Sequence, residues 1–230
     1  MNTPFNASSS SSFSPETSVR TFIQRVYHWM AIGLALTGFV AYWTASHPTV
    51  LRALAGGGFW ILAIAEIGLV FWLSASITKI SAQAATLAFL AYAFLNGLTM
   101  SFVFLAYTGA SIATVFFMTA GTFGAVSVFG WTTKADLSSA QGFFAMALIG
   151  VIIASIANIF MHSTILYWII SYAGLGVFIG LTAYDTQKLK GIHQNSGGTE
   201  QTAILGALAL YLDFINMFLY MMRIFGKRRD

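Results

Sequence analysis

The sequence contains no cysteine, and this absence excludes several classes of protein. Without thiols the chain offers neither a disulfide framework nor a thiolate metal site, and cysteine-based catalysis is ruled out as well. Charged residues make up only 8% of the 230 residues, whereas a soluble domain carries about 25%. The chain is therefore not expected to fold as a soluble globular domain.

Motifs of common enzyme classes are also missing. The four histidines are scattered and form no His-Glu-x-x-His pair, and neither a serine-nucleophile elbow nor a phosphate-cradling glycine loop is present. We expect no enzymatic activity, no cofactor and no nucleic-acid partner. The net charge of +4 arises partly from a basic cluster near the C-terminus, for which we expect anionic lipid as the partner: Arg223, Lys227, Arg228 and Arg229.

Hydrophobic residues dominate what is there, at 57% of the chain, with a mean hydropathy of +0.76. A transmembrane helix needs about 20 predominantly apolar residues. On that criterion the sequence predicts an all-α membrane protein, a seven-transmembrane helix bundle with short loops, within residues 20–225. The predicted helices are 21–45, 57–78, 83–107, 110–132, 140–161, 164–187 and 201–224.

Polar segments flank and interrupt these runs. Residues 1–19 are serine-rich and lack the basic-then-apolar order of a secretory signal, so we expect a disordered tail. Residues 226–230 form a basic C-terminal tail. Between the last two helices, residues 188–200 are long and polar enough to predict a mobile loop.

Lysine and arginine predict the orientation, because they accumulate on the cytoplasmic side of a membrane protein. With the N-terminus in the cytoplasm, the outer loops carry only Arg52. Seven spans would however place the basic C-terminal cluster outside, against the same rule. Either the tail is tolerated there, or the last segment re-enters and leaves the tail inside. The inner segments then hold Arg20, Arg25, Lys79, Lys134, Lys188 and Lys190.

Glu66, Asp185 and Asp213 lie inside long hydrophobic runs, and they are three of only seven acidic residues. A carboxylate at membrane depth costs at least about 2–3 kcal/mol, so such residues usually face a water-filled cavity or a partner within the bundle. Plainer interpretations exist: Asp185 could pair with Lys188 one turn on, and Glu66 could be a structural hydrogen-bonding group. We interpret the three acids as a path for protons or cations.

Asp185 and Asp213 are predicted to meet, because they lie on consecutive antiparallel helices. Two carboxylates in one low-dielectric site cannot both ionise at low cost, so the pair is expected to titrate as a unit and to act as a proton switch. Once deprotonated, the pair would offer hard oxygen ligands of the kind that suit calcium.

Three short motifs around such residues resemble a known family: LNGLTMS at 95–101, YDTQ at 184–187 and YLDFIN at 211–216. In this order on a seven-helix frame they resemble the Bax inhibitor-1 family, also called transmembrane Bax inhibitor motif proteins. The likeness spans about residues 20–225. The compact size and short loops look like a bacterial member, which implies the inner (plasma) membrane.

The resemblance implies a pH-sensitive calcium leak channel whose proton sensor, by position, is Asp185 and Asp213, with transient calcium binding there. Some members are similar in carrying an acid in the second helix, which Glu66 would match as part of the ion pathway. Some also have an arginine near the end of that helix that latches one aspartate. Here the segment 74–79 has no arginine, and Lys79 is the candidate cationic latch.

Other classes remain open. A proton-coupled transporter, or a regulator that binds other membrane proteins, would also use intramembrane acids. An intramembrane aspartyl protease also places aspartates on consecutive helices, but its second aspartate follows Gly-x-Gly, whereas Asp213 follows Leu210, Tyr211 and Leu212. All three prolines, moreover, precede the second predicted helix, which leaves no later Pro-Ala-Leu motif.

Overall fold

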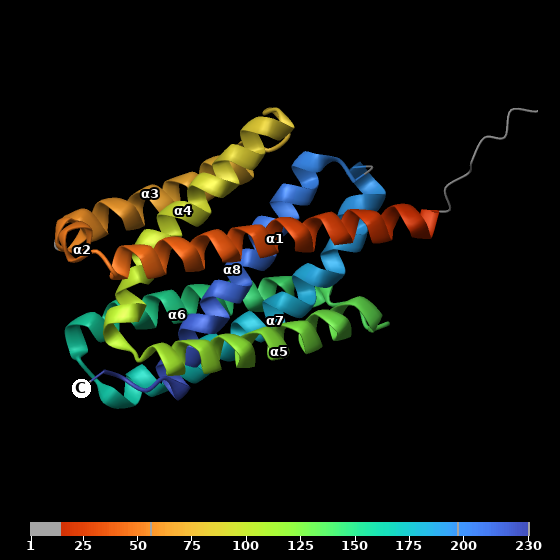
Figure 1. The fold of residues 1–230 in the computed structure, drawn as a ribbon. Helices are drawn as coiled ribbons and strands as arrows, with labels where there is room; N and C mark the ends of the chain where they lie inside the picture. Colours follow the sequence, from red (N-terminus) through yellow and green to blue (C-terminus); the bar gives the residue numbers. More distant parts are fainter. Residues whose placement is uncertain (1–14, 56, 197, 230) are drawn as a thin grey trace, which may run out of the picture.

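The structure, a computed structural model, describes residues 15–55, 57–196 and 198–229. These residues form helices and no strand, apart from one isolated bridge between Tyr107 and Arg228, which confirms the predicted all-α class. In chain order (Figure 1) the helices are α1 Pro15–Ala45, α2 Pro48–Leu54, α3 Gly57–Ser76, α4 Ala82–Ala106, α5 Gly109–Thr132, the 3-10 turn η1 Ser138–Ala140, α6 Gln141–Met161, α7 Thr164–Ser196 and α8 Glu200–Phe225.

Several of these helices are long and apolar enough to cross a membrane. Within the described residues, α3 to α8 each qualify alone, which gives 6, and α1 taken with α2 gives up to 7, although that pair bends by 103°. The bend follows from Pro48, which cannot continue α1 but is favoured in the first turn of a new helix. The short helix α2 was not predicted. The last segment, α8, is one continuous helix, so a re-entrant final segment is not what the structure shows.

The predicted loop at 188–200 is wrong for most of its length, because α7 continues to Ser196. The reason is an apolar stripe within the polar stretch: Leu189 is 2% exposed and, with Ile192, packs in the main core. A helix keeps these two residues on one face. At the other terminus α1 begins at Pro15, so the helix includes the last part of the segment 1–19, and residues 1–14 lie outside the described part.

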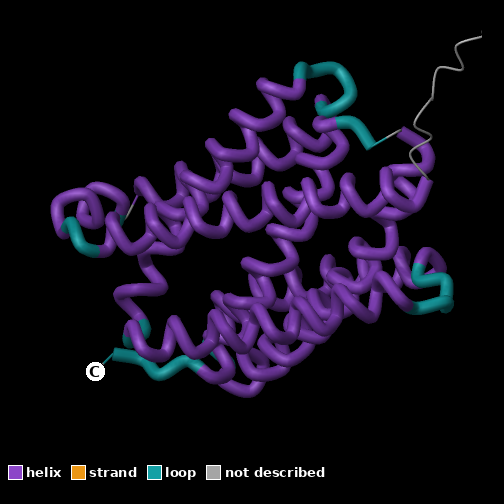
Figure 2. The backbone as a smooth tube through the Cα atoms, turned by 45° about the vertical axis from the view of Figure 1, so that its right-hand side comes forward, coloured by secondary structure: helices purple, strands orange, loops and turns teal. Residues whose placement is uncertain are grey.

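Helix α8 is the centre of the bundle. It packs against α1, α4, α5 and α7, and Figures 1 and 2 show it crossing between the group formed by α1, α3 and α4 and the group formed by α5, α6 and α7. In its most apolar stretch 67% of the residues are buried, against 6% for α3 and for the span containing α6. The exposed apolar faces of these outer helices suit contact with lipid.

Helices α1 and α4 approach closely at Gly97. A Cβ atom added there would lie 2.6 Å from Val40 Cβ and 2.9 Å from the backbone oxygen of Thr37. Both neighbours belong to α1 close to its backbone, so neither can swing aside. Small residues at a helix crossing permit this kind of backbone contact in membrane proteins.

Replacing Gly97 by alanine is expected to destabilise the fold by about 1–3 kcal/mol, because the added methyl group overpacks the α1–α4 contact. Thermal unfolding in detergent, followed by tryptophan fluorescence, measures the effect. Gly121→Ala in α5 is the matched control, since nothing lies within 4 Å of its position and the change should gain helix propensity alone. Equal unfolding temperatures for the two variants would contradict the proposed contact.

Candidate functional site

The structure places Asp185 on α7 and Asp213 on α8, two helices that pack along their length. Asp213 is only 4% exposed, and its Oδ2 atom has no hydrogen-bond partner among the described residues. The two carboxyl groups interact electrostatically. The two acids therefore lie on packed helices and near enough to influence each other electrostatically.

A pocket of about 470 Å³ opens beside the pair. Asp185 lines it, together with Lys188 one turn further along α7, Ser74 from α3 and Leu212 from α8. The lining does not include Asp213, which belongs to the buried core. Asp185 thus faces the pocket, and Asp213 lies behind it with an unpartnered oxygen.

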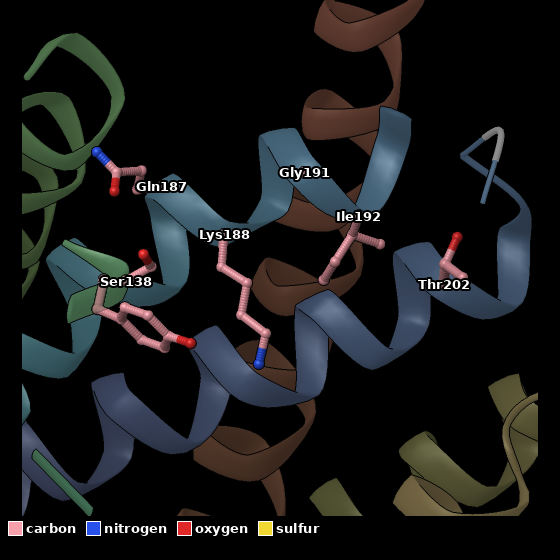
Figure 3. A pocket seen from close by; sticks show the side chains of 7 residues that line it. Ser138, Gln187, Lys188, Gly191, Ile192 and Thr202 are labelled. Atoms are coloured by element: carbon pink, nitrogen blue, oxygen red, sulfur yellow. The ribbon is translucent and has the colours of Figure 1, made fainter. Parts of the chain in front are cut away.

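Lys188 is the cation of this site. It interacts electrostatically with Asp185, and its ammonium lies 5.6 Å from the centre of the Tyr184 ring. A neighbouring pocket of about 460 Å³ is lined by Lys188 as well, with Ser138 and Gln187 on its other side. Figure 3 shows the Lys188 side chain extending from α7 towards α8. The described residues show no ion pair between Lys188 and Asp185, so the plainer interpretation of Asp185 is seen only as a longer-range attraction to Lys188.

The candidate latch Lys79 lies elsewhere. It is exposed in the turn that follows α3, and in the described part of the chain no ion pair includes it. Because α3 ends at Ser76, the helix does not carry Lys79 back towards the bundle interior. In this conformation Lys188, and not Lys79, supplies the positive charge beside Asp185.

Glu66 heads a chain of hydrogen bonds that crosses the bundle. Its carboxylate accepts from Thr99 Oγ1 at 2.9 Å and from Asn96 Nδ2 at 3.3 Å, both on α4. The hydroxyl of Tyr211 on α8 donates to Asn96 Oδ1 at 3.0 Å and lies 2.6 Å from Thr37 Oγ1 on α1. This network, from here on the Glu66 network, joins four helices.

The Glu66 network and the aspartate pair meet α8 on different faces. Tyr211 and Asp213 are two residues apart, and a helix turns by about 200° over that distance. Tyr211 therefore faces α1 and α4, while Asp213 faces α7. The structure does not bring Glu66 into the aspartate pair, but it connects both to the same helix.

The structure gives individual roles to several polar residues whose roles were not predicted from the sequence. Asn96 and Thr99 belong to the quoted LNGLTMS motif, yet their contact with Glu66 depends on the packing of α3 on α4. Gln187 fastens the segment after α5, since its amide donates to Ala135 O and accepts from Leu137 N, each at 2.8 Å. The only indication in the sequence was that these polar residues lie in motifs within or next to apolar stretches.

A clasp between α1 and the start of α8 was also missed. Arg25 Nη1 pairs with Glu200 Oε2 at 3.2 Å, and Trp29 Nε1 donates to Glu200 Oε1 at 2.6 Å. Glu200 is the first residue of α8, where a negative charge interacts favourably with the helix dipole. These contacts hold α1 and α8 together at the end of the bundle where α8 begins.

Calcium would find only part of its usual shell here. The ion takes six to eight oxygen ligands, and the described residues include no group of three or more carboxylate, histidine or cysteine side chains that could hold a metal. The pocket beside the pair offers one carboxyl group, that of Asp185, and the hydroxyl of Ser74.

Comparison with known proteins agrees with the motifs and the helical frame. The family described as inhibitor of apoptosis-promoting Bax1 matches residues 19–230. The chain belongs to this family. The resemblance read from the motifs is thereby confirmed, and it extends through the described helices from α1 to the C-terminal segment.

Bacterial relatives cover almost the whole chain. The inner membrane protein YbhL of Escherichia coli is 47% identical over 222 residues, which is 94% of this chain and 95% of the relative. A protein of Rickettsia prowazekii is 42% identical over 216 residues, 92% of each chain. A membrane protein of Streptococcus pyogenes is 35% identical over 219 residues, 92% of this chain and 95% of the relative. The family members and the apolar helices together support a membrane protein.

Removing the Tyr211 hydroxyl should loosen the bundle. In Tyr211→Phe, Asn96 and Thr37 lose a buried partner, and we expect a loss of about 1–3 kcal/mol in stability. Thermal unfolding in detergent provides the measurement. Tyr172→Phe is the control, because Tyr172 is 59% exposed on α7. A Tyr211→Phe protein as stable as the Tyr172→Phe protein would show that the network contributes nothing.

Proposed function

We propose that the protein is a pH-sensitive calcium leak channel gated by the Asp185 and Asp213 pair. The observation that carries the proposal is the buried, unpartnered Oδ2 atom of Asp213 beside Asp185, which itself faces a pocket. A carboxyl group kept without a partner inside a bundle is costly to stability. Such groups in membrane proteins are usually retained for ion or proton movement.

The proposed mechanism depends on how many protons the two carboxyl groups hold between them. With one proton between them, the pair carries a single negative charge, and Lys188 lies close enough to balance it. Loss of that proton leaves two negative charges in a poorly solvated site, and they repel each other across the α7–α8 contact. The added charge separates the two helices and attracts calcium to Asp185 from the pocket.

Glu66 extends the pathway from the other side of α8. Its carboxylate is held by Asn96 and Thr99, and Asn96 contacts Tyr211. Because Tyr211 and Asp213 share α8, a shift of this helix moves both the network and the aspartate pair. Glu66 serves in this proposal as the second acidic position that a cation meets.

The proposal places the protein in a bacterial inner membrane with its N-terminus in the cytoplasm. The relative from Escherichia coli is named an inner membrane protein, and lysine and arginine outside the C-terminal cluster favour this orientation. If α1 with α2 counts as one span, the number of spans is odd and the C-terminus lies outside. No enzymatic activity is proposed, and calcium ions and protons are the species that move.

Asp213→Asn should abolish the pH dependence of calcium flux, because an amide cannot share or release the proton. Asp185→Asn should do the same, since either change breaks the pair. The measurement is calcium entry into liposomes containing the purified protein, from acidic to mildly alkaline pH. Retention of the full pH dependence in both variants would rule out this gate.

Asp136→Asn is the matched control for these variants. Asp136 lies in the exposed segment before η1, where the hydroxyl and the backbone N–H of Ser138 hold the pKa of its carboxyl below the ordinary value. It is therefore ionised throughout the measured range, and its removal should leave the pH profile unchanged. Saturable countertransport in the same liposomes would favour a proton-coupled carrier, and cleavage of an added helical peptide would favour a protease.

A further inference from the structure

A second polar pocket lies at the C-terminal end of α8, opposite the end that begins at Glu200. It has a volume of about 400 Å³ and receives Arg223 from α8, Arg228 from the C-terminal segment, Tyr167 from α7 and Asn158 from α6. Tyr167 and Lys188 are separated along α7 by about 30 Å, at 1.5 Å of rise per residue. That distance is close to the thickness of the hydrocarbon core of a bilayer, so this pocket and the Lys188 pocket lie near opposite membrane faces.

Tyr167 organises the two arginines of this pocket, which is named here the arginine pocket. Arg223 lies 5.2 Å from the centre of the Tyr220 ring and 6.0 Å from that of Tyr167. Arg228 lines the pocket together with Tyr107 and Tyr167, and interaction with these two tyrosines raises the pKa of Arg228 above its ordinary value. Both guanidinium groups carry the permanent charge of arginine and lie beside the same aromatic residue, Tyr167.

The backbone fixes Arg228 in this position. Thr108 N donates to Lys227 O at 3.1 Å, and Arg229 N donates to Ala106 O at 3.0 Å. Lys227 N also donates to Ser111 Oγ at 2.8 Å. These bonds fasten the C-terminal segment to the turn between α4 and α5, so Arg228 is a built part of the pocket and not a loose tail residue.

The arginine pocket has positive charge without a balancing acid. No described acidic side chain lines it, whereas Ser155 and Asn158 add polar groups. The Oδ1 atom of Asn158 accepts a hydrogen bond from Ser163 N at 3.0 Å. The NH₂ group of Asn158 is not used in that bond. Two fixed guanidinium groups with a nearby amide suit a phosphate, which arginine recognises through paired hydrogen bonds.

The surface next to the pocket is apolar. On α6, Ile152, Ile156 and Ile159 are 49%, 53% and 59% exposed and recur at helical spacing along one face. Ile159 also lines the arginine pocket. A phosphate placed between the arginines would thus lie next to an exposed apolar helix face, as the phosphate of a lipid requires.

We propose that the arginine pocket binds the phosphodiester headgroup of an anionic phospholipid, with the acyl chains lying along the exposed isoleucines of α6. Headgroups occupy the level of the bilayer at which these helix ends lie. The bound lipid would supply the counter-ion that the described part of the chain lacks there. This inference does not depend on calcium conduction.

The test is native mass spectrometry of the delipidated protein titrated with phosphatidylglycerol. Arg223→Gln and Arg228→Gln should each weaken binding about tenfold, as loss of one charge-assisted contact implies. Phosphatidylcholine should bind much more weakly than phosphatidylglycerol, and inorganic phosphate at millimolar concentration should not displace the lipid. The two substitutions lie on different segments, so a folding defect in one leaves the other informative, and size-exclusion chromatography reports folding.

Arg52→Gln is the matched control. Arg52 is an exposed arginine on α2, at the same end of the bundle as the C-terminus (Figure 1), and lies outside the pocket. An equal loss of lipid binding in Arg52→Gln would mean attraction to the whole basic surface and would overturn the proposal. So would unchanged binding in both pocket variants. Displacement by inorganic phosphate would assign the site to the free ion.

Discussion

The burial of an acidic side chain in the most enclosed helix is the constraint on which the rest of the structure depends. Asp213 lies on α8, which four helices surround, and its Oδ2 atom has no partner among the described residues. Hydrophobic burial cannot compensate a lone charge of this kind, because removing an ion from water costs more than the surrounding apolar contacts return. A neutral carboxylic acid avoids this cost, and in the function proposed above its proton is shared with Asp185, which would tie the charge state of the pair to the packing of α7 on α8.

Polar contacts divide α8 into three regions with different tasks. At its start, Glu200 is held by Arg25 and Trp29. In its middle, Tyr211 and Asp213 face opposite sides, one towards the Glu66 network and the other towards α7. At its end, Arg223 enters the arginine pocket. Because all three regions lie on α8, a small movement of this helix would displace them together, although they share no direct contact.

The chain's membership of the Bax inhibitor family accords with this arrangement. The match over residues 19–230 includes the motifs on α4, α7 and α8, and the structure shows what each contributes locally. Asn96 and Thr99 bind Glu66, Gln187 fastens the segment after α5, and Asp185 faces a pocket. The resemblance implied a cationic latch at the end of α3, whereas the structure has Lys188 near Asp185, on the same helix.

Hydropathy by itself determined the number and approximate bounds of the long helices, the all-α class and the position of the acids within them, because a bilayer demands about 20 apolar residues per span. The motifs were enough to indicate the family. Hydropathy could not show that α7 runs on to Ser196, since Leu189 and Ile192 count as core residues only once α1 and α8 are in place. Tertiary structure alone decided which polar groups meet: Glu66 with Asn96 and Tyr211, Lys188 rather than Lys79 with Asp185, and Arg223 with Arg228. The reason is that a contact between helices depends on how each helix is rotated and where the two cross. Packing at positions such as Gly97 sets this arrangement, and the hydrophobic periodicity of the sequence does not predict it.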